Sequence, residues 1–172
     1  MTPAERRAFV RSHRTAIFGY NRVSDGPAMS IVYYVMEDDD TILVSTMRER
    51  AKAKAVGRRP KVSLCVLDEQ WPPTYLQVYC DAEVDTDAAL TVDVMMGIAE
   101  VMAGKPLDES VRPLVAAGAE NEGRVVLRLR PYATYETPPR HVNDESDIAS
   151  LTHWTNESAP WNTDTHIEAP QG

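Results

Sequence analysis

The stretch that decides the fold runs from Thr41 to Leu67 and reads TILVSTMRERAKAKAVGRRPKVSLCVL. It begins with an apolar segment at 41–46 and ends with another at 62–67, and β-branched side chains recur in both, which is typical of strands. Between them lies an alanine- and cation-rich segment at 49–56, which predicts a short helix that stops at the following glycine and proline. The stretch therefore predicts a strand, a short basic helix and a second strand.

The short helix and its flanks carry an unusual positive charge. Residues 48–61 contain seven basic side chains and one acidic one, although the net charge of the whole chain is −8. Here the basic run follows two hydroxyl side chains, Ser45 and Thr46, at the end of a strand. Because the first N–H groups of a helix have no partners within it and attract anions, this arrangement is a candidate anion site. A charge run is more often a plain solvated face, and that alternative stays open.

Hydrophobic patterns on both sides extend the prediction to an antiparallel barrel. Further strands are expected at 14–20, 29–36, 75–84 and 124–130, and further helices at about 3–13, 87–103 and 109–117. The apolar side chains of the 87–103 helix, methionines included, are expected to lie in the core. A parallel sheet would require helical crossovers after most strands. The six strands therefore favour a mainly β fold with helices, a six-stranded antiparallel barrel.

Composition divides the chain into two parts. Residues 1–135 have a net charge of −2, whereas residues 136–172 carry −6 and contain four of the twelve prolines. The second part shows no hydrophobic period that would predict a helix or a strand. We therefore expect a folded domain at 1–135 and an acidic, proline-rich tail at 136–172 that is extended or disordered.

Several classes of function are disfavoured by composition. A net charge of −8 argues against a general nucleic-acid binder. No apolar run approaches the roughly 18 residues of a membrane span, and the first residues lack the apolar stretch of a signal peptide. Two cysteines, Cys65 and Cys80, make no disulfide framework, so a reduced, cytoplasmic setting is expected. We expect no metal site, because the histidines are not spaced as ligands.

The strand–helix–strand stretch at 41–67, together with the segments at 26–30 and 75–84, resembles the split-barrel flavoproteins related to pyridoxamine 5'-phosphate oxidase. The likeness covers about residues 10–132 and is closest to the actinobacterial branch that uses the deazaflavin coenzyme F420 rather than FMN. It implies a six-stranded antiparallel split β-barrel of the FMN-binding type, and a homodimer with two cofactor sites in the subunit interface. The segments that carry it are GPAMS at 26–30, ILVST at 42–46, RAKAK at 50–54, RRPKVSL at 58–64 and YLQVYCDAEV at 75–84.

The resemblance also implies which residues bind the cofactor. By position, Ser45, Thr46, Arg50 and Lys52 would hold its phosphate, and Lys54 with the later cations would meet the oligoglutamate tail of coenzyme F420. No catalytic residue is predicted, since the cofactor carries the hydride and the protein needs few catalytic side chains. The full predicted set of cofactor-binding residues is Ser30, Ser45, Thr46, Arg48, Arg50, Lys52, Lys54, Tyr75 and Gln77.

The function expected from this resemblance is hydride transfer between reduced coenzyme F420 and a small unsaturated or carbonyl substrate. One alternative is an FMN-dependent oxidase or reductase of the same fold. Another is a non-catalytic protein that binds a flavin, a deazaflavin or haem. The expected partners are a second copy of the chain and a small-molecule substrate, with neither nucleic acid nor a membrane.

Overall fold

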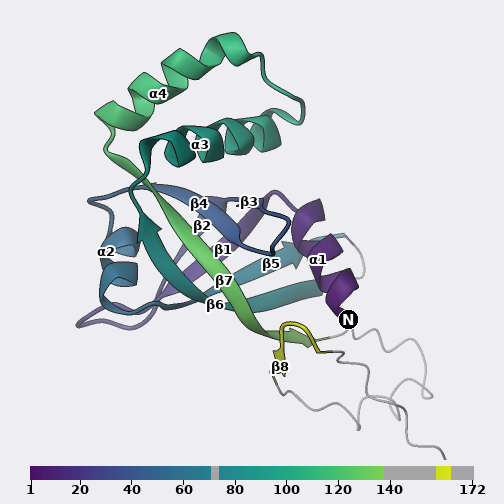
Figure 1. The fold of residues 1–172 in the computed structure, drawn as a ribbon. Coiled ribbons are helices and arrows are strands. Elements are labelled where there is room, and N and C mark those ends of the chain that lie inside the picture. Colours follow the sequence, from purple (N-terminus) through teal and green to yellow (C-terminus); the bar gives the residue numbers. More distant parts are fainter. Residues whose placement is uncertain (71–73, 138–157, 164–172) are drawn as a thin grey trace, which may run out of the picture.

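The structure is a computed structural model that describes residues 1–70, 74–137 and 158–163. Figure 1 shows one curled sheet with helices around it. The helices are α1 (Pro3–Ser12), α2 (Ala51–Arg58), α3 (Ala88–Ala103) and α4 (Arg112–Asn121), with a 3₁₀ turn, η1 (Glu109–Val111), before α4. The strands are β1 (Thr15–Tyr20), β2 (Ala28–Tyr33), β3 (Val35–Met36), β4 (Ile42–Met47), β5 (Lys61–Asp68), β6 (Thr74–Asp85), β7 (Arg124–Thr137) and β8 (Ala159–Pro160).

The strands form one antiparallel sheet, in the order β2-β1-β5-β6-β7-β4-β3, and β8 adds to β7. The sheet curls so that β2 and β4, which are far apart in this order, come near each other. This confirms the expected mainly β fold and the antiparallel split barrel. Among the described helices, none has both the length and the apolar character needed to cross a lipid bilayer.

Strand alternation separates the inside of the curled sheet from its outside. Phe18, Leu64, Val78 and Leu127 are fully buried and belong to one large cluster that fills the interior. A second, smaller cluster lies on the other face of β4 and β7, where α3 packs. It contains Leu43, Val94 and Val126, with Val35, Leu90 and Ile98 packed against it. The core position predicted for α3 is therefore confirmed for the helix face toward the sheet.

Two strands differ from their predicted bounds. The segment predicted as one strand at 29–36 is divided into β2 and β3 at Tyr34, whose side chain is buried and whose hydroxyl donates to the backbone oxygen of Val10 at 2.6 Å. β7 continues past Pro131 to Thr137 instead of stopping at residue 130. The register with β6 shifts there, between Tyr79 and Cys80. A bulge of this kind accepts a proline, which has no N–H to donate to the ladder.

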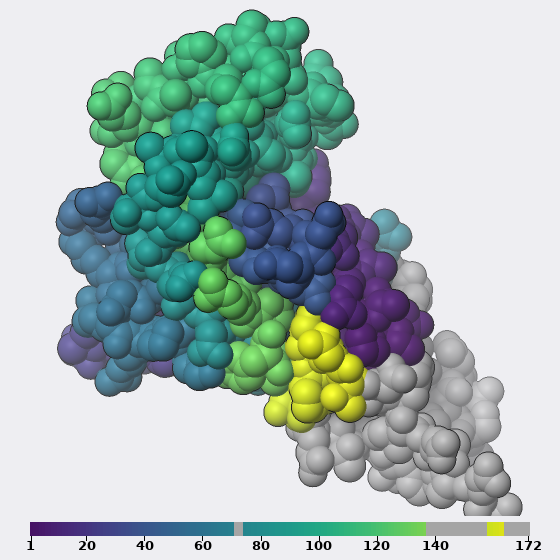
Figure 2. All heavy atoms as spheres, in the orientation of Figure 1, coloured from purple at the N-terminus to yellow at the C-terminus, as the bar shows by residue number. Residues whose placement is uncertain are grey.

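The segment 158–163, far along the predicted tail, packs against the barrel. The Trp161 side chain is buried in the main cluster, and its Nε1 donates to Asp40 Oδ2 at 2.9 Å. The buried Arg6 guanidinium donates to the backbone oxygens of Pro160 and Trp161. Figure 2 shows this segment, in yellow, between α1 and β7. Residues 138–157 and 164–172 of the predicted tail lie outside the described residues, and the domain boundary at residue 135 stays a prediction.

Replacing Trp161 should test this docking directly. We expect Trp161→Ala to lower the free energy of unfolding by about 3–5 kcal/mol, because it empties a large buried site. The control is Leu114→Ala on α4, where the side chain is 76% exposed, and a change within about 0.5 kcal/mol is expected. Urea unfolding followed by circular dichroism measures both. An equally small effect of the two substitutions would contradict the docking of 158–163.

Candidate functional site

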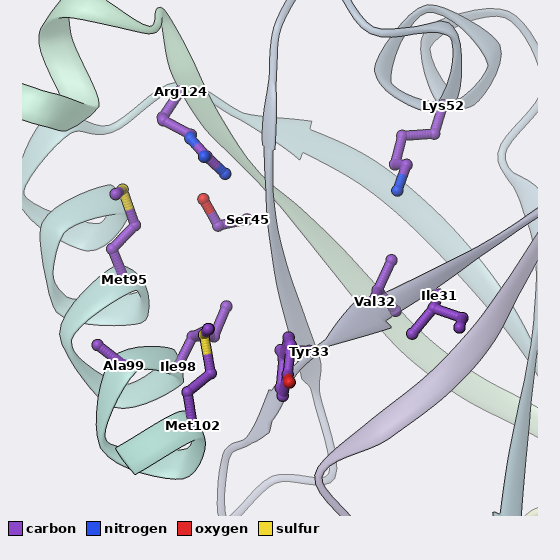
Figure 3. Close-up of a pocket in the computed structure, with 10 residues that line it drawn as sticks. All are labelled: Ile31, Val32, Tyr33, Ser45, Lys52, Met95, Ile98, Ala99, Met102 and Arg124. Carbon is purple, nitrogen blue, oxygen red and sulfur yellow. The ribbon is translucent and has the colours of Figure 1, made fainter.

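A cavity of about 320 Å³ opens where the curled sheet is incomplete. β3 pairs only with Ile42 and Leu43, so the edge of β4 beyond Leu43 has no strand partner on that side among the described residues. The facing strand, β2, pairs only with β1. The cavity lies between these two strand edges, with α2 and α3 beside it (Figure 3). It is lined by Ile31, Val32, Tyr33, Ser45, Lys52, Met95, Ile98, Ala99, Met102 and Arg124.

Lys52 brings an ammonium group into this cavity. It is the second residue of α2, half-buried, and its Nζ lies 5.9 Å from the centre of the Phe18 ring. Within the described residues it has no ion-pair partner. Its pKa is lowered, first because burial removes water from the ammonium and second because Arg50 adds a nearby positive charge. An anion bound beside Lys52 would relieve both effects.

The start of α2 lies next to Lys52 and differs from its predicted place. The helix begins at Ala51 rather than at residue 49, because the Arg50 N–H closes a turn onto the backbone oxygen of Met47 at 3.0 Å. Arg50 is the N-cap, and no side chain caps the helix. The N–H groups of the first turn therefore remain open to an outside acceptor. This confirms a helix start beside the strand end, which the candidate anion site requires.

Ser45 contributes a hydroxyl that lacks a hydrogen-bond partner. Its Oγ is out of contact with solvent, lies at the wall of the cavity and has no partner in the part of the chain that the structure describes. The Ser30 hydroxyl on β2 is also buried and has no hydrogen-bond partner among the described residues, but Ser30 does not line this cavity. A buried hydroxyl left without a partner destabilises the folded protein by about 1–3 kcal/mol. A bound ligand with an acceptor or donor group at this wall would offset that cost.

The wall opposite β2 is apolar and comes from α3. Met95, Ile98, Ala99 and Met102 line it (Figure 3). The helical spacing of these residues predicted only a core role, and Met102 is in fact 53% exposed. Arg124, at the start of β7, also lines the cavity. It was not predicted as a site residue, because a lone arginine at a strand end carries no functional signal in the sequence. Only the sheet pairing of β7 with β4 brings it beside Ser45.

The other predicted residues lie at different distances from the cavity. Arg48 and Arg50 are exposed near the start of α2. Lys54 points to solvent and pairs with Glu49, with Nζ and Oε2 2.6 Å apart. This contact lowers the pKa of Glu49. Thr46 is buried, and strand alternation places its side chain on the opposite face of β4 from Ser45.

Tyr75 and Gln77 do not line the cavity of their own chain. Both lie on β6, in the middle of the sheet, and are half-buried. Gln77 is directly opposite Cys65, which is opposite Ile17, which is opposite Ile31. Paired residues share a face of the sheet. Gln77 therefore lies on the same outer face as Ile31, at which the cavity begins.

Comparison with known proteins identifies the family. The sequence profile of the family described as Pyridoxamine 5'-phosphate oxidase matches residues 2–138, which is most of the chain. This chain belongs to the pyridoxamine 5'-phosphate oxidase family. The resemblance stated from its motifs is thereby confirmed at the level of the family. No curated protein matches the sequence.

Several solved structures share the fold of this chain at low sequence identity. The conserved hypothetical protein Rv2991 from Mycobacterium tuberculosis aligns with a TM-score of 0.69 and 22% identity, over 85% of this chain and 94% of that one. An F420 reductase aligns with a TM-score of 0.58 and 19% identity, over 74% and 94%. HutZ, the heme storage protein from Vibrio cholerae, aligns with 0.55 and 15%, over 76% and 91%. At these identities the likeness shows the fold alone.

Proposed function

We propose that this member of the pyridoxamine 5'-phosphate oxidase family binds coenzyme F420 in the cavity between β2, β4, α2 and α3. We further propose that it is an oxidoreductase that transfers a hydride between the reduced deazaflavin and a small unsaturated or carbonyl substrate. The observation that carries this proposal is the half-buried ammonium of Lys52, which has no ion-pair partner among the described residues and faces the cavity.

The residues around Lys52 fit a cofactor phosphate. The open N–H groups at the start of α2 and the positive end of the helix favour an anion there. Arg50 is adjacent, and a guanidinium can bind two phosphate oxygens at once. The unpartnered hydroxyl of Ser45 lies at the wall of the same cavity. When bound, the cofactor supplies the hydride chemistry, and the protein binds it, orients it and shields it from water.

The preference for coenzyme F420 over FMN rests on cations beyond the phosphate. Two of the four later cations are already paired within the chain, Lys54 with Glu49 and Lys61 with Asp81. Arg58 and Arg59 are exposed and have no ion-pair partner among the described residues. These two arginines are the groups that we propose for the oligoglutamate tail. The structural likeness to an F420 reductase supports the same choice.

Two alternatives can be separated by simple measurements. FMN also carries a phosphate, so Lys52 and Arg50 would hold it equally well. A haem-binding role is favoured by the likeness to HutZ, the heme storage protein. Absorbance of the purified protein distinguishes a deazaflavin, a flavin and haem. Titration of the protein with both flavin-type cofactors decides between F420 and FMN.

The outer face of the sheet supports a homodimer. Met29 and Ile31 are both 74% exposed, and Ile17 and Leu67 on neighbouring strands are also exposed. Contiguous apolar surface of this kind marks an interaction site. We propose that a second copy of the chain covers this face. Tyr75 and Gln77 lie on that face, so each protomer would contribute them to the cofactor site of the other, in agreement with the family resemblance.

Substitution of Lys52 tests the cofactor site. We expect Lys52→Ala to weaken binding of both FMN and coenzyme F420 by about ten- to a hundredfold, because a charge-assisted phosphate contact is lost. The matched control is Lys54→Ala, two residues along the same helix, whose ammonium is exposed and paired with Glu49. The control should change FMN affinity less than about threefold. Unchanged dissociation constants for both cofactors in Lys52→Ala would contradict the proposed site.

The pH dependence of binding should report the same ammonium. In the free protein the pKa of Lys52 lies below its usual 10.5, because the group is partly buried and near Arg50. A bound phosphate favours the charged form and raises the pKa, so the complex keeps a proton that the free protein loses. FMN affinity should therefore fall as the pH rises through the lowered pKa of Lys52, at pH values below 10.5. In Lys52→Arg it should stay constant, because a guanidinium remains charged. An equal pH dependence in both proteins would count against Lys52.

The dimer can be tested at a position outside the cavity. Met29 lies on the apolar outer face and does not line the cavity. We expect the wild-type protein to sediment as a dimer at micromolar concentration and Met29→Lys to sediment as a monomer, because a charge would be buried without a partner. The control is Val23→Lys in the β1–β2 loop, where the side chain is 77% exposed. A wild-type monomer that still binds cofactor would refute the dimer.

A further inference from the structure

Arg124 is the one charged residue of the cavity wall that does not belong to the basic run around α2. We propose that Arg124 and Ser45 form a second oxyanion-binding point in the cavity, separate from Lys52. The ligand group bound there is a carboxylate or a phosphate. This inference rests on the proposed function in one respect, since it takes the cavity to be the ligand site.

The backbone holds Arg124 at the mouth of the gap between β2 and β4. Gly123 has a φ of +58°, a conformation that favours glycine, and it turns the chain from α4 into β7. Its backbone oxygen accepts from the N–H of Arg48 at 2.9 Å. Arg124 is then paired in register with Met47 at the end of β4. The position of Arg124 is thus set by the sheet and not by a mobile surface loop.

The Nε side of the Arg124 guanidinium contacts Glu122, and its terminal nitrogens point toward the cavity. Its Nε donates to Glu122 Oε2 at 2.6 Å, and the side chain is only 26% exposed. In the described part of the chain its two terminal nitrogens have no hydrogen-bond partner. Figure 3 shows the group directed toward Ser45. An arginine held through Nε still presents donors suited to an oxyanion.

The Ser45 hydroxyl supplies an independent reason to expect a ligand at this end. Its Oγ is buried, without a partner among the described residues, and lies between Arg124 and the rest of the cavity wall. A hydroxyl and a guanidinium that converge on one space can donate to the same oxyanion. The ion pair with Glu122 does not explain why Arg124 lies beside the Ser45 hydroxyl, because a partly exposed ion pair contributes little to the stability of the fold.

The other residues that line the cavity indicate the chemical character of the rest of the ligand. Lys52, on α2, and Arg124, on β7, lie on different sides of the cavity, and the apolar wall of α3 continues from the Arg124 end. A ligand that fills the cavity would therefore have an apolar body against Met95 and Ile98 and an anionic group at Arg124. Because the proposed function places the cofactor phosphate at Lys52 and the cofactor tail at Arg58 and Arg59, the oxyanion at Arg124 belongs to the small unsaturated substrate.

Two pairs of probes, each an anion with a neutral counterpart, test the proposal. FMN and riboflavin differ by the phosphate, and cinnamate and cinnamamide differ by the carboxylate. Binding of each is measured by titration calorimetry, the second pair with and without saturating coenzyme F420. In Arg124→Ala the preference for cinnamate over cinnamamide should fall by about ten- to a hundredfold, with cinnamamide binding little changed. The preference for FMN over riboflavin should stay, because the proposed phosphate contact is made by Lys52. Arg124→Lys should retain part of the preference.

The matched control is Arg130→Ala, on the same strand, where the arginine pairs with Glu83 outside the cavity. It should leave both preferences unchanged. Loss confined to cinnamate over cinnamamide assigns the oxyanion to the substrate, whereas loss confined to FMN over riboflavin would place the cofactor phosphate at Arg124 instead of Lys52 and overturn the second point. If Arg124→Ala alters neither preference, or if the wild-type protein shows neither, the inference is overturned. A failure of coenzyme F420 to bind would overturn the proposed function instead, because the probe pairs are also measured without it.

Discussion

The site depends on a sheet that curls without closing. A strand edge presents unpaired N–H and C=O groups, which a closed barrel would cover with a neighbouring strand. Here β3 is only two residues long and covers β4 no farther than Leu43. The chain covers the remaining gap with helices: α2 lies at one end of it and α3 beside it. Side chains of two helices and two strand edges therefore surround one cavity.

Electrostatics makes this cavity different from the rest of the molecule. The whole chain has a net charge of −8. Several of its described cations form ion pairs with acidic side chains, as Lys54, Lys61 and Arg130 do. Lys52 is an exception that is also half-buried, so its charge is held at a cost in solvation. The unpartnered hydroxyl of Ser45 adds a second unfavourable feature at the same wall. Such groups are retained at sites where a ligand compensates them.

The segment 158–163 shows how distant parts of the chain stabilise the end of the barrel away from the cavity. Asp40, in the turn between β3 and β4, has a φ of +71°. Its carboxylate accepts from Arg7 and from Trp161. One turn thus joins α1, the β3–β4 hairpin and the C-terminal segment. The same hairpin carries Leu43 and Ser45, so the geometry of the cavity wall is linked to this packing.

The sequence by itself determined the local elements, because hydrophobic period, capping residues and glycine or proline act over a few residues. The helix that starts at Pro3, the strands on both sides of α2 and the position of Lys52 near the start of that helix were all predictable. The candidate anion site was proposed from the sequence for the same reason, since strand end, helix start and cations are neighbours in the chain. The length of β7 was not, because a bulge that accepts Pro131 depends on pairing with β6.

Only the tertiary structure decided which distant residues meet. Arg124 and the α3 side chains reach the cavity because β7 pairs with β4 and α3 packs on both strands. These contacts join distant segments: Ser45 and Val126, which are paired, lie about 80 residues apart in the chain. The burial of Trp161 likewise depends on a surface formed by α1 and Asp40, more than 100 residues earlier. Local patterns carry no information on such pairings, since they are selected by the register of the whole sheet and the shape of the core.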